Sequence, residues 1–136
     1  MQRSIPVVMI LVLAGATAFA QAVPAPVTTV WDTGFGLVTI VQEGAIIHGS
    51  YPYSSGRLVG VIEGNVIYGY WWESDDSTGC GPQGLWCGPF RFVLSADWKS
   101  FVGYYDKASR GVTMVGMLGT GWTWNGTLQS GSLVRR

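Results

Sequence analysis

Apolar and polar residues alternate along most of the chain, in short runs rich in β-branched and aromatic residues. Alternation with a period of two is the pattern of β-strands, because successive side chains of a strand point to opposite faces. No segment shows a convincing helical period. The pattern predicts eight strands, near residues 35–42, 45–51, 57–62, 65–72, 89–95, 99–105, 111–118 and 121–128.

Two kinds of connection join these predicted strands. Tight turns are expected at residues 43–44, 63–64, 96–98 and 119–120, where glycine mostly supplies the positive φ that a hairpin turn needs. Longer connections are expected at residues 52–56, 73–88 and 106–110. In an antiparallel meander the long connections would gather at one end of the sheet and the tight turns at the other.

Six of the runs share one frame, in which a glycine stands two residues from an apolar residue on either side. The trios are Ile47-Gly49-Tyr51, Leu58-Gly60-Ile62, Ile67-Gly69-Trp71, Phe101-Gly103-Tyr105, Met114-Gly116-Leu118 and Trp124-Gly126-Leu128. The three members of a trio lie on one face of a strand. A glycine weakens a strand unless it allows a bend or lets an aromatic ring lie over the bare backbone.

Repeated bends in a sheet of eight antiparallel strands favour closure into an up-and-down barrel. We therefore predict an all-β fold, a single antiparallel meander that closes. The alternative is an open sheet of repeated hairpins, whose unpaired edges would be prone to aggregation.

The stretch from Trp31 to Tyr51, which contains GAIIHGSY, and FVGYY at 101–105 resemble the strand signature of avidin-like barrels, which are secreted eight-stranded meanders. Of the positions that bind biotin in that family, only Tyr51 has a counterpart, and Leu37 stands where a serine is expected. The resemblance implies the architecture and not biotin binding. The repeated frame also resembles secreted bacterial proteins of unknown function built from glycine-aromatic β-hairpin repeats.

The chain begins with the features of a secretory signal peptide. A positively charged residue, Arg3, precedes an apolar stretch that ends in the small-residue motif Ala18-Phe19-Ala20. We expect residues 1–20 to be removed, so that the protein is secreted or periplasmic and has no membrane insertion afterwards. Residues 21–34 are expected to form an extension that leads into the first strand, residues 35–128 the barrel domain, and residues 129–136 a C-terminal tail, which is frayed at Arg135 and Arg136.

Composition narrows the range of functions. Without Arg3 the chain carries eight acidic and seven basic side chains, and a nearly neutral chain lacks the basic surface that nucleic acids require. Seven tryptophans and six tyrosines in so short a chain offer large rigid contact areas with a polar end.

Cys80 and Cys87 are expected to form a local disulfide in an oxidising compartment. A short ring of this kind would mainly stiffen the connection at residues 73–88. Two thiols and a single histidine fall short of a tetrahedral metal site, and we expect neither a metal nor a cofactor.

The long connections point to a candidate binding site. Strands ending at Tyr51, Trp71 and Tyr105 run in the same direction, so their last rings are expected around one mouth of the barrel, with Trp86 above them. We predict that these four aromatic residues bind a small apolar or sugar-like ligand. The alternative is that the rings plug the barrel end as core.

The opposite face of the same strands is also apolar, whereas a soluble antiparallel sheet normally carries polar residues on its solvent side. A covered outer face, and hence a possible homo-oligomer, is the interpretation. Otherwise the outside tolerates tyrosines with hydrated hydroxyls. The candidate interface residues are Val59, Val61, Tyr68, Tyr70, Val102, Tyr104, Val115 and Met117.

Catalytic signals are weak. His48 is the only histidine, and the likeness of EGAIIHGSY to EGNVIYGYW aligns it with Tyr68 on the outer face. Glu73, Asp75 and Asp76 could act as paired carboxylates in glycoside hydrolysis or as calcium ligands, but a solvated loop explains them as well. Asn125 begins a glycosylation sequon inside a predicted strand.

Three functional hypotheses follow, in order of preference. The first is a secreted, non-enzymatic barrel that binds a small ligand at its aromatic mouth. The second is a structural, self-assembling extracellular protein that uses its apolar outer face. The third is a hydrolase that acts through the acidic loop.

Overall fold

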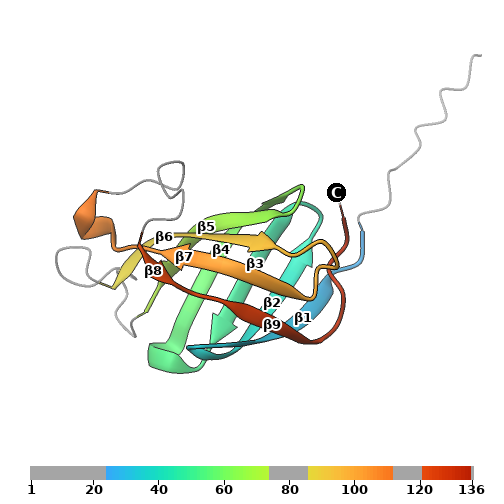
Figure 1. Cartoon of the computed structure of the whole chain (residues 1–136), viewed down its shortest axis with the longest axis horizontal. Helices are drawn as coiled ribbons and strands as arrows, with labels where there is room; N and C mark the ends of the chain where they lie inside the picture. Colours follow the sequence, from blue (N-terminus) through green and yellow to red (C-terminus); the bar gives the residue numbers. More distant parts are fainter. Residues whose placement is uncertain (1–23, 74–85, 112–120, 136) are drawn as a thin grey trace, which may run out of the picture.

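The structure is a computed structural model that describes residues 24–73, 86–111 and 121–135. These residues form an all-β fold, shown in Figure 1. The strands are β1 (Val27–Thr33), β2 (Gly36–Glu43), β3 (Ile46–Tyr51), β4 (Gly56–Glu63), β5 (Val66–Trp72), β6 (Cys87–Leu94), β7 (Ser100–Tyr105), β8 (Trp122–Thr123) and β9 (Gly126–Ser130). Single 3-10 turns lie at η1 (Tyr53–Ser55) and η3 (Ala108–Arg110).

The strands close into an eight-stranded antiparallel barrel, which confirms the predicted fold. Each of β1 to β7 pairs with the next strand along the chain, and β9 pairs with both β7 and β1 to complete the ring. The short strand β8 continues β9 along β7, so the two are segments of one interrupted strand. Closure leaves no long unpaired edge in the ring, which is the physical advantage of a barrel over an open sheet.

The set of eight strands differs from the predicted one. Strand β1 lies in a region predicted to be an extension, and it fills the position between β2 and β9. The predicted strand at 111–118 lies almost wholly outside the described residues, and the place beside β7 is taken by β8 and β9. The predicted strand at 121–128 is broken at Trp124 and Asn125.

The break between β8 and β9 is bridged by other hydrogen bonds. The backbone N–H of Trp124 donates to the Gly103 carbonyl at 2.7 Å, and the Gly103 N–H donates to the side-chain oxygen of Asn125 at 3.1 Å. The Asn125 side chain thus replaces a backbone acceptor in the ladder.

A cluster of buried apolar side chains fills the interior of the barrel. The predicted glycine face is the inner face, as alternation requires, and it carries Trp31, Phe92 and Phe101 at no more than 3% exposure. The rings of Phe92 and Phe101 stack with centroids 4.2 Å apart, and Trp31 contacts Phe101 at 5.3 Å.

Two inner-face glycines lie opposite each other in the middle of β4 and β5. Gly60 pairs with Gly69 across β4 and β5. A Cβ on Gly60 would overlap the carbonyl oxygen of Tyr68, and a Cβ on Gly69 would overlap that of Val59. The close approach of the two strands therefore requires glycine at both positions, while the predicted role of glycine in bending the sheet stays a prediction.

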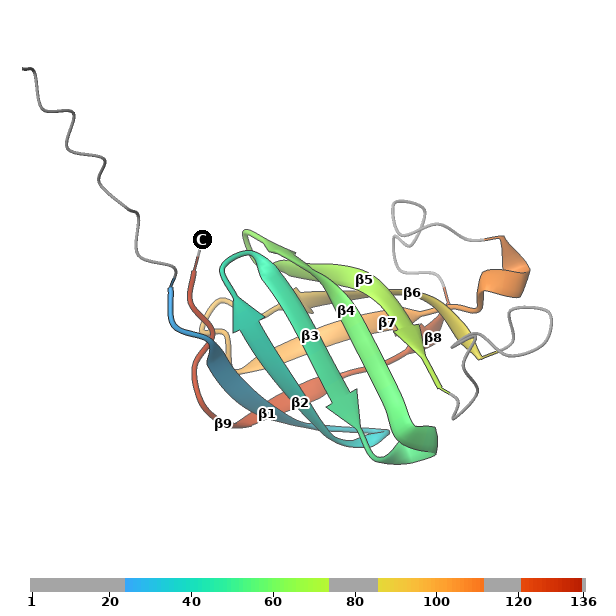
Figure 2. The ribbon, with the colours of Figure 1, turned by 180° about the vertical axis from the view of Figure 1, so that it is seen from behind.

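The two ends of the barrel differ, as the pattern of connections predicted. Figures 1 and 2 show the long connections and η3 gathered at one end, together with the tight turn between β1 and β2, whereas the hairpins β2–β3, β4–β5 and β6–β7 and the C-terminal segment lie at the other. Gly44 and Gly64 take positive φ in the tight turns, and so does Trp98, with φ 59°.

The described part of the C-terminal segment is docked and not frayed. Leu133 is buried in the core cluster. The buried Gln42 side chain donates to the Val134 carbonyl and accepts from the Val134 N–H, each at 2.8 Å. Arg135 lies over the Trp98 ring at 5.0 Å. This docking was hard to predict from the sequence, because one apolar and one amide residue make most of the contacts.

Candidate functional site

The predicted mouth brings three of its four aromatic residues together, but two of them are buried. Tyr51 and Trp71 are each only 3% exposed and belong to the core cluster, while Tyr105 is partly exposed. Trp71 contacts Tyr105 edge-on at 5.6 Å, and Trp124 lies 5.1 Å from Tyr51. The rings therefore close this end of the barrel, in agreement with the alternative interpretation that they serve as core.

An acidic side chain lies inside this plug. The Tyr51 hydroxyl donates to Oε1 of Glu73 at 2.8 Å, and Glu73 is 9% exposed. Burial raises the pKa of Glu73, against the opposing effects of the Tyr51 hydrogen bond and of the positive charge of Lys107. Burial also raises the pKa of Tyr51, and the negative charge of Glu73 adds to that effect. The pair is a buried polar anchor.

Backbone groups fix Trp71 beside the start of the 106–110 connection. The Trp71 indole N–H donates to the Asp106 carbonyl at 3.0 Å, and the Asp106 N–H donates to the Pro89 carbonyl. Asp106 is 1% exposed and its carboxylate accepts from the Lys107 N–H at 2.7 Å. Trp71 is thus held by the fold and is not free to receive a ligand in this conformation.

The exposed rings at this end are Tyr53, Trp86 and Trp122, at 56%, 45% and 42% exposure. Trp86 makes a backbone contact, accepting from the Glu73 N–H at 2.8 Å. Trp122, which the sequence analysis did not single out, contacts Tyr105 at 5.6 Å and lies under the Lys107 ammonium group at 5.6 Å. Alternation did not signal its exposure, because Trp122 and Trp124 are two residues apart and would share one face of an unbroken strand.

The remaining candidates are scattered. His48 is exposed on the outside of β3, 3.5 Å from the Glu43 carboxylate. Asp75 and Asp76 lie outside the described residues, as does Cys80, so the disulfide to Cys87 stays a prediction. The described ranges contain no cluster of three or more His, Cys, Asp or Glu residues suited to a metal ion.

Six of the eight candidate interface residues are described, and all six lie on the outer face. We call them, together with Val93, the outer apolar patch: Val59, Val61, Tyr68, Tyr70, Val93, Val102 and Tyr104. Cross-strand pairing makes the apolar surface continuous over β4 to β7, since Val59 pairs with Tyr70, Val66 of β5 with Val93, and Val93 with Val102. The other two candidates, Val115 and Met117, lie outside the described residues.

The patch is exposed to solvent in the single chain. Val59, Tyr70, Val93 and Val102 are 41%, 47%, 37% and 52% exposed. Tyrosine hydroxyls and Arg91, which pairs with Tyr68 and Tyr104, supply its polar groups. A hydrogen bond to the Glu63 carboxylate raises the pKa of Tyr68. These groups leave most of the patch apolar.

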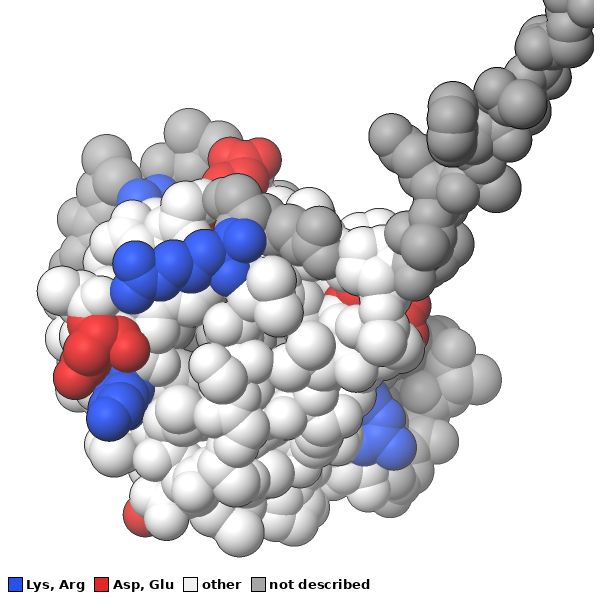
Figure 3. Space-filling model, turned by 90° about the vertical axis from the view of Figure 1, so that its right-hand side faces the viewer, with Lys and Arg blue, Asp and Glu red and all other residues white. Residues whose placement is uncertain are grey.

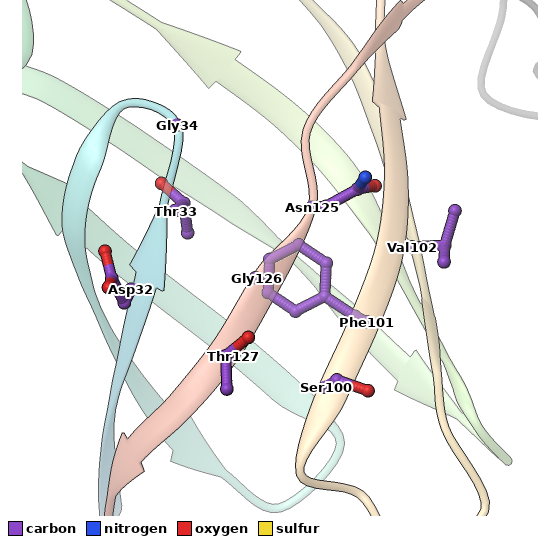
Figure 4. Close-up of a pocket in the computed structure, with 9 residues that line it drawn as sticks. All are labelled: Asp32, Thr33, Gly34, Ser100, Phe101, Val102, Asn125, Gly126 and Thr127. Atoms are coloured by element: carbon purple, nitrogen blue, oxygen red, sulfur yellow. The ribbon is translucent and has the colours of Figure 1, made fainter.

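A hollow of about 470 Å³ lies on the outer surface between β1, β7 and β9. Figure 4 shows Asp32 and Thr33 on one side of it, Ser100 and Val102 on the other, and Asn125 above. Thr33 and Asn125 already bond to the backbone, to the Gly36 carbonyl and the Gly103 N–H. The hollow marks the interrupted seam of the barrel, and its polar groups mainly support the backbone there.

Charge is sparse and dispersed. Figure 3 shows isolated charged side chains around a broad uncharged area on the side of the molecule turned toward the viewer. Among the described residues, no helix is both long and apolar enough to cross a membrane.

Comparisons with models of protein families, with curated proteins and with solved structures found no match for this chain.

Proposed function

We propose that this protein is a non-enzymatic, extracytoplasmic β-barrel module that associates with a second copy of itself through the outer apolar patch. The observation that carries the proposal is the continuous exposure of apolar side chains over β4 to β7. The expected signal peptide at residues 1–20 supports the location outside the cytoplasm.

The distribution of apolar residues favours association over an internal binding function. The interior is occupied by packed rings, whereas the outer patch leaves several valine and tyrosine side chains in water. Burying apolar surface stabilises a complex by about 25 cal/mol per Å². Tyrosine adds contact area with little loss of side-chain freedom.

A second copy is the occupant that fits the charge and shape of the patch. A two-fold axis brings the same surface of two chains together, so an apolar patch meets an apolar patch. Eight acidic and eight basic side chains balance in the whole chain, so long-range repulsion between copies is weak. An interface of about 800 Å² per partner would cover the patch and its polar edge.

Sedimentation equilibrium of the purified protein over a range of concentrations tests the proposal. We expect a reversible dimer for the natural chain and an association constant at least about tenfold lower for Tyr70→Lys, because a charge within the patch loses hydration on association. Thr28→Lys, an exposed substitution on β1 away from the patch, is the matched control and should associate normally. A natural chain that stays monomeric, or equal association of both variants, would contradict the proposal.

A small apolar or sugar-like ligand at the loop-rich end is the second candidate. It is favoured by the exposed rings of Trp86 and Trp122, the second of which contacts the partly exposed Tyr105. Tryptophan fluorescence titrated with a neutral oligosaccharide tests it. Trp122→Ala should weaken any quenching, and an unchanged spectrum of the natural chain would count against this site.

A further inference from the structure

A second surface feature, independent of the outer apolar patch in chemistry, lies over β2 to β5. Two adjoining hollows of about 460 and 330 Å³ share Thr39, Ser50 and Arg57, and together they form one open groove. Strands β2, β3 and β4, which carry most of the residues that line the groove, face the viewer in Figure 2. Val59 lies at the border between the groove and the patch.

Strand register places four side chains of different chemistry in one row across the groove. Thr39 pairs with Ser50, Ser50 with Arg57, and Arg57 with Trp72. Directly opposed side chains in an antiparallel sheet have Cβ atoms about 5 Å apart. Since the neighbouring residues of each strand, such as Leu58, point into the core, the row lies on the outside. It presents two hydroxyls, a guanidinium and an indole ring.

The guanidinium of Arg57 is available to a ligand. One of its nitrogens, Nη1, donates to the Gly56 carbonyl at 3.1 Å. Within the described ranges the only ion pair joins His48 to Glu43, so no described carboxylate neutralises Arg57. A guanidinium has five N–H donors in a planar fork, and most of them remain for an acceptor in the groove.

Backbone strain is concentrated at the rim of the same groove. Ser54 and Ser55 have φ values of 47° and 50°, in the left-handed region that residues with a side chain seldom occupy. Ser55 also lines the groove. Strained backbone at non-glycine residues is found preferentially at binding sites, where the surrounding structure maintains it. The strained turn adds a third hydroxyl beside Arg57.

We propose that this groove binds a carboxylated sugar, with Arg57 holding the carboxylate, the serine and threonine hydroxyls contacting sugar hydroxyls, and Trp72 flanking the ring. A planar guanidinium matches a carboxylate with two parallel hydrogen bonds. Among the described residues that line the groove, Arg57 is the one cationic side chain without a carboxylate partner. The other basic residue there, His48, lies against Glu43. A singly charged carboxylate suits that arrangement better than a phosphate dianion.

Glucuronate is the probe, and glucose and acetate are its comparisons. Amide resonances of the full-length protein should shift on addition of glucuronate at Thr39, Ser50 and Arg57. Glucose lacks the carboxylate and acetate lacks the hydroxyls, so each should bind at least about tenfold more weakly. Glucose binding as tightly as glucuronate would overturn the proposal, because recognition would then not depend on the carboxylate.

Variants separate specific recognition from general charge. Arg57→Gln should weaken glucuronate binding about tenfold or more, and Arg57→Lys should restore only part of it, since an ammonium group lacks the planar fork. Lys99→Gln removes the same charge at the opposite, tight-turn end and should bind normally. No binding of glucuronate by the natural chain, or equal losses in the Arg57 and Lys99 variants, would refute the site. Sedimentation of Arg57→Gln should match that of the natural chain, which keeps this result separate from self-association.

Discussion

Glu73 shows at the scale of one residue how the loop-rich end is built. The residue is 9% exposed, and its carboxylate accepts a hydrogen bond from the hydroxyl of the aromatic residue Tyr51. The sequence placed this acid in a solvated loop, because three acids follow the strand in WESDDSTG. Alternation reveals which face a side chain occupies but not whether a neighbouring connection covers it.

The raised pKa of Glu73 leads to a pH-dependent contribution to stability. A carboxyl whose folded-state pKa lies above its ordinary value of 4.5 stabilises the fold below that value, and this contribution is lost as the pH rises through the raised pKa. Glu73→Gln, which still accepts the Tyr51 hydrogen bond, should therefore gain stability relative to the natural chain as the pH increases from about 4.5 to 7.5. Urea unfolding at several pH values measures the difference.

Asp32→Asn is the control, because Asp32 is an exposed carboxylate on β1 and its replacement removes the same charge without burial. Its stability difference from the natural chain should change less over this pH range. A constant difference for Glu73→Gln would show that burial does not govern this residue.

At the scale of the strand, the six predicted strands from 35 to 105 match β2 to β7 with shifts of only a few residues. The alternation of β-branched and aromatic residues was sufficient to predict these strands, because turns that contain glycine mark many of their ends. Strand β1 was missed because Pro24 and Pro26 precede it and because Thr28 and Asp32 make it look like an extension. Its pairing partner, β9, is about a hundred residues away, and no local pattern encodes that contact.

The strand predicted at the trio Met114-Gly116-Leu118 lies outside the described residues and stays a prediction, and the place beside β7 is occupied by β8 and β9. The predicted strand directions correctly placed Tyr51, Trp71 and Tyr105 at the same end of the barrel. Depth within the barrel depends on side chains from other strands, such as Trp124, and it was not predictable from each strand alone.

The pair Gly60 and Gly69 provides a test of how the strands bend. Gly60→Ala or Gly69→Ala forces a methyl group against a backbone carbonyl of the neighbouring strand, so each should reduce the free energy of unfolding by about 1–3 kcal/mol. Chemical denaturation measures this. Gly34→Ala, where the added methyl would have no neighbour within 4 Å, should change stability little, and an equal loss at all three sites would contradict the explanation.

At the scale of the whole molecule, the barrel has one weak seam. Strand β7 pairs with β9 at two positions and with β8 at two more, with Trp124 and Asn125 between them. The other pairs of neighbouring strands in the ring, apart from β1 with β9, are joined by at least five registered pairs. Local opening should begin where pairing is sparse.

Hydrogen exchange of the native protein tests this. Amides of β8 and β9 that face β7 should exchange faster than those between β4 and β5, and Asn125→Ala should accelerate exchange at Gly103, whose N–H bonds to Asn125. Gln129→Ala, an exposed change on the same strand, should leave Gly103 unchanged. Uniform protection around the ring would argue against a weak seam.

The pairing of β1 with β9 also sets the order in which this chain can fold. During synthesis the first strand emerges long before the last, and hairpins β2–β3 and β4–β5 can form early because their contacts are local. The free edge of β1 has no partner until residues 126–130 arrive. During that interval the unpaired edge of the growing sheet can pair with other chains. A partner that holds nascent strands apart would therefore benefit this protein most just before its final thirty or so residues appear.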